Sequence, residues 1–160
     1  MRDRRPDTVA DIVFKPPPAG AAARAGEQER VAPRAAEIDA SGEFPWDVVE
    51  ALREAEILAL PFEERYGGLG TGSLMTLVAI EELSKACATT GLVLAMQDLS
   101  TIAVRLHGTD EQKERYLPRI ASGEWLGAYA LTEPGAGSDA AAMLATARRE
   151  DDEYVLDGAK

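Results

Sequence analysis

Residues 131–139, with the sequence LTEPGAGSD, carry the groups needed to bind a flat or phosphorylated ligand. Gly135 and Gly137 have no side chain, so a ligand can come close to the backbone at these positions. The hydroxyls of Thr132 and Ser138 and the free backbone amides add hydrogen-bond donors at the same point. A heteroaromatic ring with carbonyl acceptors, or a phosphate, fits this chemistry. An ordinary glycine turn is the alternative interpretation of the glycine pattern.

The same glycines match a relaxed dinucleotide-binding fingerprint, Gly135-x-Gly137-x-x-Ala140, and acidic residues follow at Glu153 and Asp157. That fingerprint requires a helix that opens at its third small residue, inside an alternating array of strands and helices. Here the preceding chain carries helical patterns instead. A nicotinamide-binding domain is therefore not expected.

Composition argues against several other chemistries. Lys and Arg number 17 against 28 Asp and Glu, and the net charge of −11 opposes contacts with the phosphates of nucleic acids. Cys87 is the only cysteine, so an internal disulfide or a multi-thiolate metal site cannot form, and no metal is expected. His107 is the only histidine and is expected at a helix end rather than in a catalytic role.

The amino-terminal stretch lacks the features of a targeting signal. Arg4 and Arg5 are followed by acidic residues and by the proline run at 16–18, without the apolar stretch of roughly 7 to 15 residues that a signal needs. No window reaches the roughly 18 apolar residues of a membrane span. We therefore expect a soluble, cytoplasmic protein without membrane contact, in which residues 1–26 form a disordered or divergent leader.

Helical periodicity or capping signals mark several segments between residues 27 and 121. Pro33 should disturb the first turns of the first segment, and Thr109 with Gln112 matches a capping box before the last one. Residues 58–72 are rich in glycine and are expected to form a loop that wraps the body. The expected helices begin at Glu27, at Pro45 as the first helical position, after Ser73 as a capping residue and at Thr90, and the last spans residues 110–121.

Residues 90–106 are mainly apolar, and the stretch is interrupted by Gln97, Asp98, Ser100 and Thr101. This combination suits an interior helix that borders a partly polar cavity. Ordinary core packing with a solvated stripe explains the pattern equally well.

The character of the sequence changes near Gly123, where strand-like patterns replace helical ones. Residues 125–131 and 153–157 are expected strands because they are rich in aromatic and branched side chains. Alternation across 144–149 favours a further strand, followed by an acidic hairpin turn. A helix across 140–149 is the competing interpretation, supported by the alanines.

Residues 129–139 resemble the first sequence signature of the acyl-CoA dehydrogenase family. Further motifs of that family occur at its spacing, and the resemblance covers about residues 29–160. It implies a mainly α fold, with an amino-terminal helical domain at residues 27–123 followed by the first strands of an incomplete β-domain at 124–160. The further motifs are residues 31–39, 61–70, 81–83, 108–113, 116–118 and 154–160.

The resemblance also implies FAD as cofactor and assigns five cofactor-binding residues: Tyr129, Leu131, Thr132, Gly137 and Ser138. By analogy with the family, Leu131 and Thr132 are expected behind the isoalloxazine ring. Gly137 and Ser138 are expected near the phosphates and the CoA part of the substrate.

The implied reaction is the α,β-dehydrogenation of an acyl-CoA thioester, with electrons leaving to an electron-transfer flavoprotein. Ser138, Leu99, Ser100 and Thr101 are the expected substrate-binding residues, the last three beside the acyl tail. The family also implies a homo-oligomer, either a tetramer or a dimer.

The resemblance places the catalytic glutamate in a carboxy-terminal domain that does not occur before Lys160. We therefore expect no catalytic residue here, and expect the 160-residue chain alone to be inactive. The acidic residues within it are expected to be solvated or helix-end carboxylates, namely Glu81, Glu82, Glu124 and Glu133. The alternative function is a non-catalytic helical module that binds a partner or has a structural role.

Overall fold

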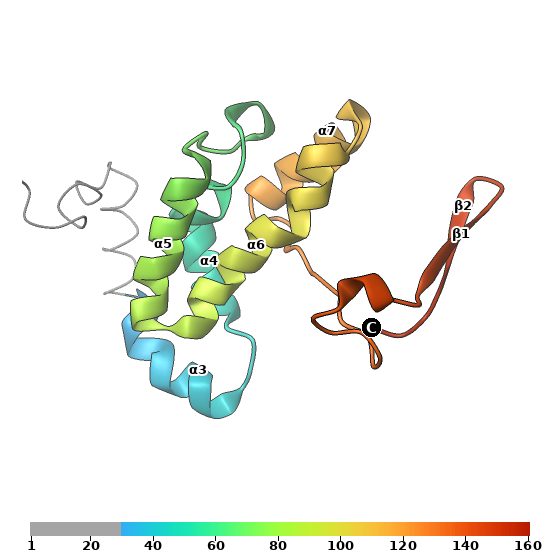
Figure 1. Cartoon of the computed structure of the whole chain (residues 1–160). Helices are drawn as coiled ribbons and strands as arrows, with labels where there is room; N and C mark the ends of the chain where they lie inside the picture. The colour runs from blue at the N-terminus through green and yellow to red at the C-terminus, as the bar shows by residue number, and fades with distance from the viewer. Residues whose placement is uncertain (1–29) are drawn as a thin grey trace, which may run out of the picture. The chain divides into compact units, whose positions relative to one another are not determined.

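The computed structural model describes residues 30–160, and the chain divides after Gly127 into two compact units (Figure 1). The expected leader at residues 1–26 and the expected helix start at Glu27 lie outside the described residues. The first unit is helical, and the second, Ala128–Lys160, contains a β-hairpin. The expectation of a mainly α fold followed by β structure is confirmed.

The first unit is built from α-helices joined by short 3-10 turns. Its longest helices, α5 and α6, are joined only by Cys87, which adopts an extended conformation, and they pack against each other (Figure 1). A Cβ atom at Gly91 would lie 2.0 Å from Ser84 Oγ and 3.1 Å from the carbonyl oxygen of Ile80, so glycine permits this close approach. The helices are α3 (Ala35–Ser41), α4 (Trp46–Glu54), α5 (Gly72–Ala86), α6 (Ala88–His107) and α7 (Asp110–Ala121), and the 3-10 turns are η2 (Ala32–Arg34), η3 (Ile57–Ala59) and η4 (Glu64–Tyr66).

Local signals explain where several of these helices begin. The capping box is confirmed, because Thr109 Oγ1 accepts from the backbone N–H of Gln112 and Gln112 Oε1 accepts from that of Thr109. The disturbance expected from Pro33 is also confirmed, since η2 precedes α3 there. His107 ends α6, as expected. Pro45 stands at the N-cap position of α4 and does not open the helix itself.

The expectation that Ser73 caps α5 is wrong. The helix already begins at Gly72, and its N-cap residue is Thr71. The hydroxyl of Thr71 donates to the carbonyl oxygen of Leu60 at 3.3 Å, so α5 starts without a side-chain cap. The hydroxyl is used to fix the preceding loop.

The core of the first unit lies between α4, α5, α6 and the loop that follows α4. Leu83 and Leu94 are fully buried within it. The loop at 58–72 also contributes to the interior, because Leu58, Leu60 and Phe62 are almost completely buried. Burial of such side chains stabilises the unit by roughly 1.5–3 kcal/mol each. The main cluster consists of Val49, Leu52, Ile57, Leu58, Leu60, Ala79, Leu83 and Leu94.

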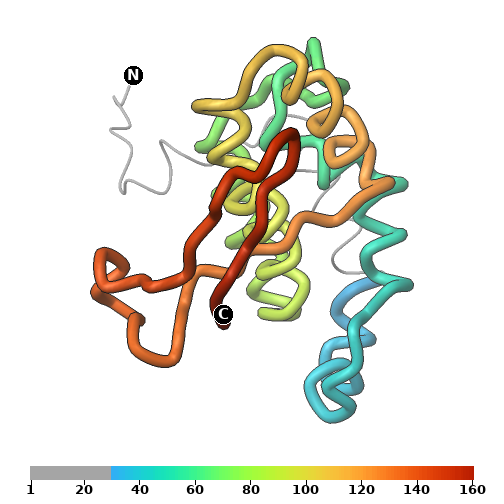
Figure 2. Tube along the Cα trace, turned by 90° about the vertical axis from the view of Figure 1, so that its right-hand side faces the viewer, coloured from blue at the N-terminus to red at the C-terminus, as the bar shows by residue number. Residues whose placement is uncertain are grey.

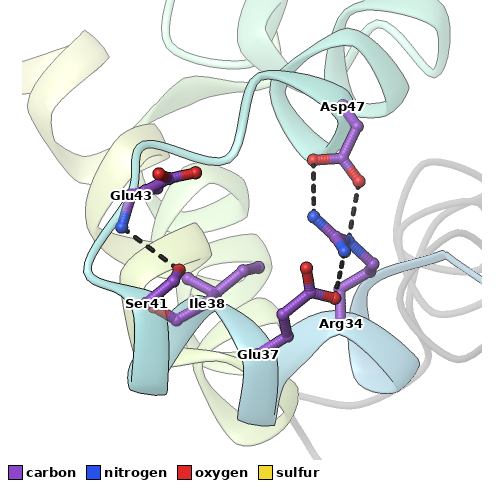
Figure 3. A network of polar contacts seen from close by, with 6 residues as sticks. All are labelled: Arg34, Glu37, Ile38, Ser41, Glu43 and Asp47. Atoms are coloured by element: carbon purple, nitrogen blue, oxygen red, sulfur yellow. Dashed lines mark hydrogen bonds and ion pairs between the residues drawn. The ribbon is translucent and has the colours of Figure 1, made fainter.

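A surface ion-pair network connects η2 and α3 to α4 (Figure 3). Arg34 Nε donates to Asp47 Oδ2 at 2.9 Å, and its guanidinium also pairs with Glu37. This hydrogen bond from Arg34 lowers the pKa of Asp47. Ser41 Oγ accepts from the backbone N–H of Glu43 at 3.2 Å, just beyond α3. Exposed networks of this type orient elements but contribute little to stability.

The second unit contains the antiparallel strands β1 (Thr146–Glu150) and β2 (Glu153–Asp157), whose trace is seen in Figure 2. Thr146 is opposite Asp157 and Glu150 is opposite Glu153, so Asp151 and Asp152 form the turn. The strand at 153–157, the strand interpretation of the preceding segment and the acidic turn are therefore confirmed. The competing helix is reduced to the 3-10 turn η5 (Ala140–Ala142).

The expected strand at 125–131 is wrong, because these residues form no regular structure. A strand needs a neighbour for its backbone hydrogen bonds. Within residues 30–160 only β1 and β2 pair as strands, and they pair with each other. None of the described helices has the length and apolar character needed to cross a membrane.

Candidate cofactor-binding segment

A tight turn forms the centre of the glycine-rich segment. The backbone N–H of Glu133 donates to the carbonyl oxygen of Ala136 at 2.9 Å, and the N–H of Ala136 donates back to Glu133 at 3.1 Å. Pro134 and Gly135 occupy the tip, where proline fixes its own φ and needs no hydrogen-bond acceptor. The turn therefore has a defined backbone.

The carboxylate of Glu133 is buried beneath this turn. It accepts from the backbone N–H groups of Leu144 at 2.7 Å and Ala145 at 3.0 Å, and from Lys160 Nζ at 2.8 Å. The side chain is only 6% exposed. The Lys160 hydrogen bond, followed by that from the Leu144 amide, lowers the pKa of Glu133 from 4.5 to about 2. The group is consequently an anion throughout the physiological range.

Lys160 extends the same cluster of contacts. Its Nζ also donates to the carbonyl oxygen of Leu131 at 3.0 Å and lies 3.3 Å from Met143 Sδ. We define the carboxylate cluster as Glu133, Lys160 and the backbone N–H groups of Leu144 and Ala145. It joins the glycine-rich segment, the entry to β1 and the chain that follows β2.

Four of the five expected cofactor contacts lie on the exposed side of this segment. Tyr129, Thr132, Gly137 and Ser138 are exposed, while Leu131 is half-buried. Within residues 30–160 the hydroxyls of Thr132 and Ser138 form no hydrogen bond, and a Cβ at Gly137 would meet no atom within 4 Å. The donors expected from the sequence are therefore unengaged, with open space beside them.

The residues expected beside the acyl tail belong to α6 in the first unit. Leu99 and Ser100 are half-buried, but Thr101 is only 2% exposed. The hydroxyl of Thr101 donates to the carbonyl oxygens of Gln97 at 3.1 Å and Asp98 at 2.9 Å. Thr101 is therefore covered by its neighbours in this unit, and its hydroxyl is engaged within α6.

Gln97 is a structural residue whose role was not anticipated from the sequence. Its Nε2 donates to the carbonyl oxygens of Ile120 at 2.9 Å and Trp125 at 3.0 Å, and its Oε1 accepts from the N–H of Gly127 at 2.8 Å. It is 1% exposed. At Gln97 the structure thus favours the core-packing interpretation. A single amide among apolar residues was the only available signal.

The expectation that four glutamates are solvated or at helix ends is wrong for two of them. Glu81 and Glu124 are exposed, but Glu82 and Glu133 are buried. Glu82 pairs with Lys85 on the same helix at 2.8 Å, whereas Glu133 finds its donors in distant parts of the sequence. Among the described residues no group of three or more His, Cys, Asp or Glu could hold a metal ion.

The described chain consists of a helical unit, then the glycine-rich segment with the free hydroxyls of Thr132 and Ser138, then the β1–β2 hairpin. Residues 20–124 match the family model described as "Acyl-CoA dehydrogenase, N-terminal domain". The chain belongs to the acyl-CoA dehydrogenase family.

Individual proteins that this chain resembles are named as acyl-CoA dehydrogenases. The chain is 44% identical over 134 residues to a short-chain specific acyl-CoA dehydrogenase of Clostridium acetobutylicum, a match that covers 83% of this chain and 35% of the relative. Butyryl-CoA dehydrogenase from Megasphaera elsdenii matches 99% of this chain and 41% of its own, with a TM-score of 0.79 and 32% identity. An acyl-CoA dehydrogenase complexed with FAD from Bacillus anthracis matches 88% of this chain and 25% of its own, with a TM-score of 0.76 and 32% identity. The chain spans about a third of the length of the curated relatives it matches.

Proposed function

We propose that this chain supplies the helical domain and the opening β segment of an FAD-dependent acyl-CoA dehydrogenase, which catalyses α,β-dehydrogenation of acyl-CoA thioesters. Membership of the family supports this proposal, as does the FAD complex of the Bacillus anthracis relative. The main structural support for the proposal is the segment at 131–138, in which the hydroxyls of Thr132 and Ser138 are exposed and free. The buried Glu133 carboxylate in the same segment is held by the N–H groups of Leu144 and Ala145.

Each expected cofactor contact has chemistry suited to FAD. When bound, FAD accepts the hydride that leaves the β-carbon of the acyl group. Thr132, with neighbouring amides, can donate to the acceptors of the isoalloxazine ring and favour its electron-rich reduced form. Leu131 and Tyr129 offer apolar area against a flat ring. Gly137 and Ser138 suit the phosphates, because one allows close approach and the other supplies a donor.

The substrate assignments follow from the same proposal. We place Ser138 near the CoA part of the substrate and Leu99, Ser100 and Thr101 beside the acyl tail. We further propose that electrons pass to an electron-transfer flavoprotein, that the complete enzyme is a homotetramer or homodimer, and that it acts in the cytoplasm.

The 160-residue chain alone should not turn over acyl-CoA. A general base needs a pKa near the working pH, whereas the pKa of Glu133 is about 2. Glu133 also has its lone pairs engaged by three donors. A dye-reduction assay with acyl-CoAs of several chain lengths tests this proposal, and turnover by the isolated chain would contradict it.

The site assignment is tested with Thr132→Ala and Ser138→Ala in the complete protein that carries this chain. A lost hydrogen bond worth about 1 kcal/mol weakens FAD binding about five-fold, and a lost bond to a charged phosphate costs more, about ten-fold or above. Ser73→Ala is the matched control, since it removes an exposed hydroxyl from α5. Unchanged flavin content and turnover in both variants would remove the assignment, and a parent protein without flavin would favour the non-catalytic module.

A further inference from the structure

We propose that Glu133 is the positioning residue of the cofactor-binding segment and acts on FAD through Thr132 and Ser138 without touching it. The inference rests on the proposed function, because it concerns how that segment acquires its binding geometry. Its structural basis is the carboxylate cluster, in which one buried side chain joins three separate stretches of the second unit.

The second unit depends on polar contacts because it has almost no apolar interior. Among residues 128–160 only Glu133 and Ala136 are buried. The strands β1 and β2 are exposed at every position. Apolar packing among residues 128–160 therefore contributes little to fixing the segment, whereas the hydrogen bonds of Glu133 join its separate stretches.

The contacts of the carboxylate involve both of its oxygens. Oε2 accepts from the N–H of Leu144, while Oε1 accepts from the N–H of Ala145 and from Lys160 Nζ. Every partner is a donor, so the site requires a group that only accepts. A glutamine would direct an NH₂ group at one of these donors and leave it unpaired.

The hydrogen bonds of Glu133 also restrict the backbone beside the expected FAD contacts, because Glu133 lies between them in the sequence. Thr132 is its direct neighbour, and the backbone of Glu133 pairs in both directions with that of Ala136, two residues before Ser138. Lys160 additionally fixes the carbonyl oxygen of Leu131. The two free hydroxyls thus flank a stretch whose backbone is tied to the cluster, and their directions depend on it.

The first test compares Glu133→Gln with the control Glu153→Gln, which changes an exposed carboxylate in β2. Hydrogen exchange of the Leu144 and Ala145 amides is followed by NMR in the 160-residue chain. We expect exchange at least ten-fold faster in Glu133→Gln and unchanged in the control. Unchanged exchange in Glu133→Gln would overturn the inference.

The second test measures FAD affinity and the absorption spectrum of bound flavin in the complete protein. We expect Glu133→Gln to raise the Kd about ten-fold and to shift the spectrum at saturating FAD, while the melting temperature of the helical unit stays the same. Faster amide exchange with an unchanged Kd and spectrum would also overturn the inference.

Lys160→Met keeps the test decisive if Glu133→Gln fails to fold, because both backbone hydrogen bonds to Glu133 remain. We expect a smaller rise in Kd for Lys160→Met and recovery in Lys160→Arg, which retains a cationic donor. Equal affinity in Lys160→Met and the parent would contradict the role of the cluster. A parent protein that binds no FAD would instead overturn the proposed function, and this inference with it, before any variant is compared.

Discussion

The side-chain oxygen of Gln97 accepts a hydrogen bond from the backbone N–H of Gly127, 2.8 Å away, across thirty positions of sequence. The amide nitrogen of the same side chain donates to two carbonyl oxygens, those of Ile120 and Trp125. Gln97 thereby connects α6 to the end of α7 and to the chain that leaves the first unit. Its three hydrogen bonds thus join separate parts of that unit in its interior.

Replacement of Gln97 by Leu should destabilise the first unit strongly. The substitution keeps approximate volume but leaves the N–H of Gly127 and the carbonyl of Trp125 without a partner, at a cost of roughly 2–4 kcal/mol, while the carbonyl of Ile120 keeps its hydrogen bond from the N–H of Gly123. Urea denaturation followed by helical circular dichroism measures this change. Thr89→Ala, an exposed hydroxyl change on the same helix, should alter stability by less than about 0.5 kcal/mol. Equal stabilities of both variants would show that Gln97 has no such role.

The carboxyl group of Glu133 should titrate far below the ordinary range. Its pKa is lowered to about 2 in the folded chain, first by the Lys160 hydrogen bond and then by that from Leu144. Because the folded-state pKa is depressed, the stabilisation is complete above the ordinary value of 4.5 and is lost as the pH falls through about 2. Carbon-13 NMR of the Glu133 carboxyl measures the midpoint. In Lys160→Met the midpoint should rise, and a midpoint near 4.5 in the parent would contradict the buried contacts.

Alanine at Gly158 should destabilise the hairpin of the second unit. Gly158 has a φ of 149°, and a Cβ there would lie 2.5 Å from Ala145 Cβ and 2.8 Å from its Cα. The strained backbone and the steric overlap cost roughly 1–3 kcal/mol. Cross-strand NMR contacts between Thr146 and Asp157 report the loss of pairing. Gly135→Ala is the control, since a Cβ at Gly135 meets nothing within 4 Å. Equal hairpin populations in the two variants would contradict this account.

Loss of the capping box should weaken α7. Thr109→Ala removes the hydroxyl that accepts from the N–H of Gln112 at 3.2 Å, which costs roughly 0.5–2 kcal/mol. Thr109→Gly should lower the free energy of unfolding by only a few tenths of a kcal/mol relative to the parent, because glycine exposes the same amides to water. Thermal denaturation of the three proteins ranks them, and a Thr109→Ala variant as stable as the parent would speak against the cap.

The reach of each interaction along the chain explains which features could be predicted. The Thr109 capping box joins residues three apart, so the sequence alone identifies it. The β1–β2 hairpin is similarly local, and alternation with an acidic turn was sufficient. The prediction of a strand at 125–131 is wrong because the residue pattern is local, whereas backbone hydrogen bonding in a sheet also requires a partner strand.

The interior of the candidate site could not be predicted for the same reason. Glu133 and Lys160 are 27 residues apart, and no periodic pattern connects them. The glycines and hydroxyls of residues 131–139 predict a binding segment, because all of these groups lie within nine consecutive residues and can be recognised without knowing the rest of the fold. The burial of the Glu133 carboxylate could not be predicted, since burial of a charge depends on donors elsewhere in the fold.

Cys87, the single extended residue between α5 and α6, is also the only sulfhydryl in the chain. It is buried beside Val31, Ile38 and Val48, so an alkylating reagent reaches it only when the helices separate locally. The rate of thiol labelling therefore reports the opening of this helix junction under native conditions. The chain thus contains its own reporter of local unfolding, which requires no engineered label.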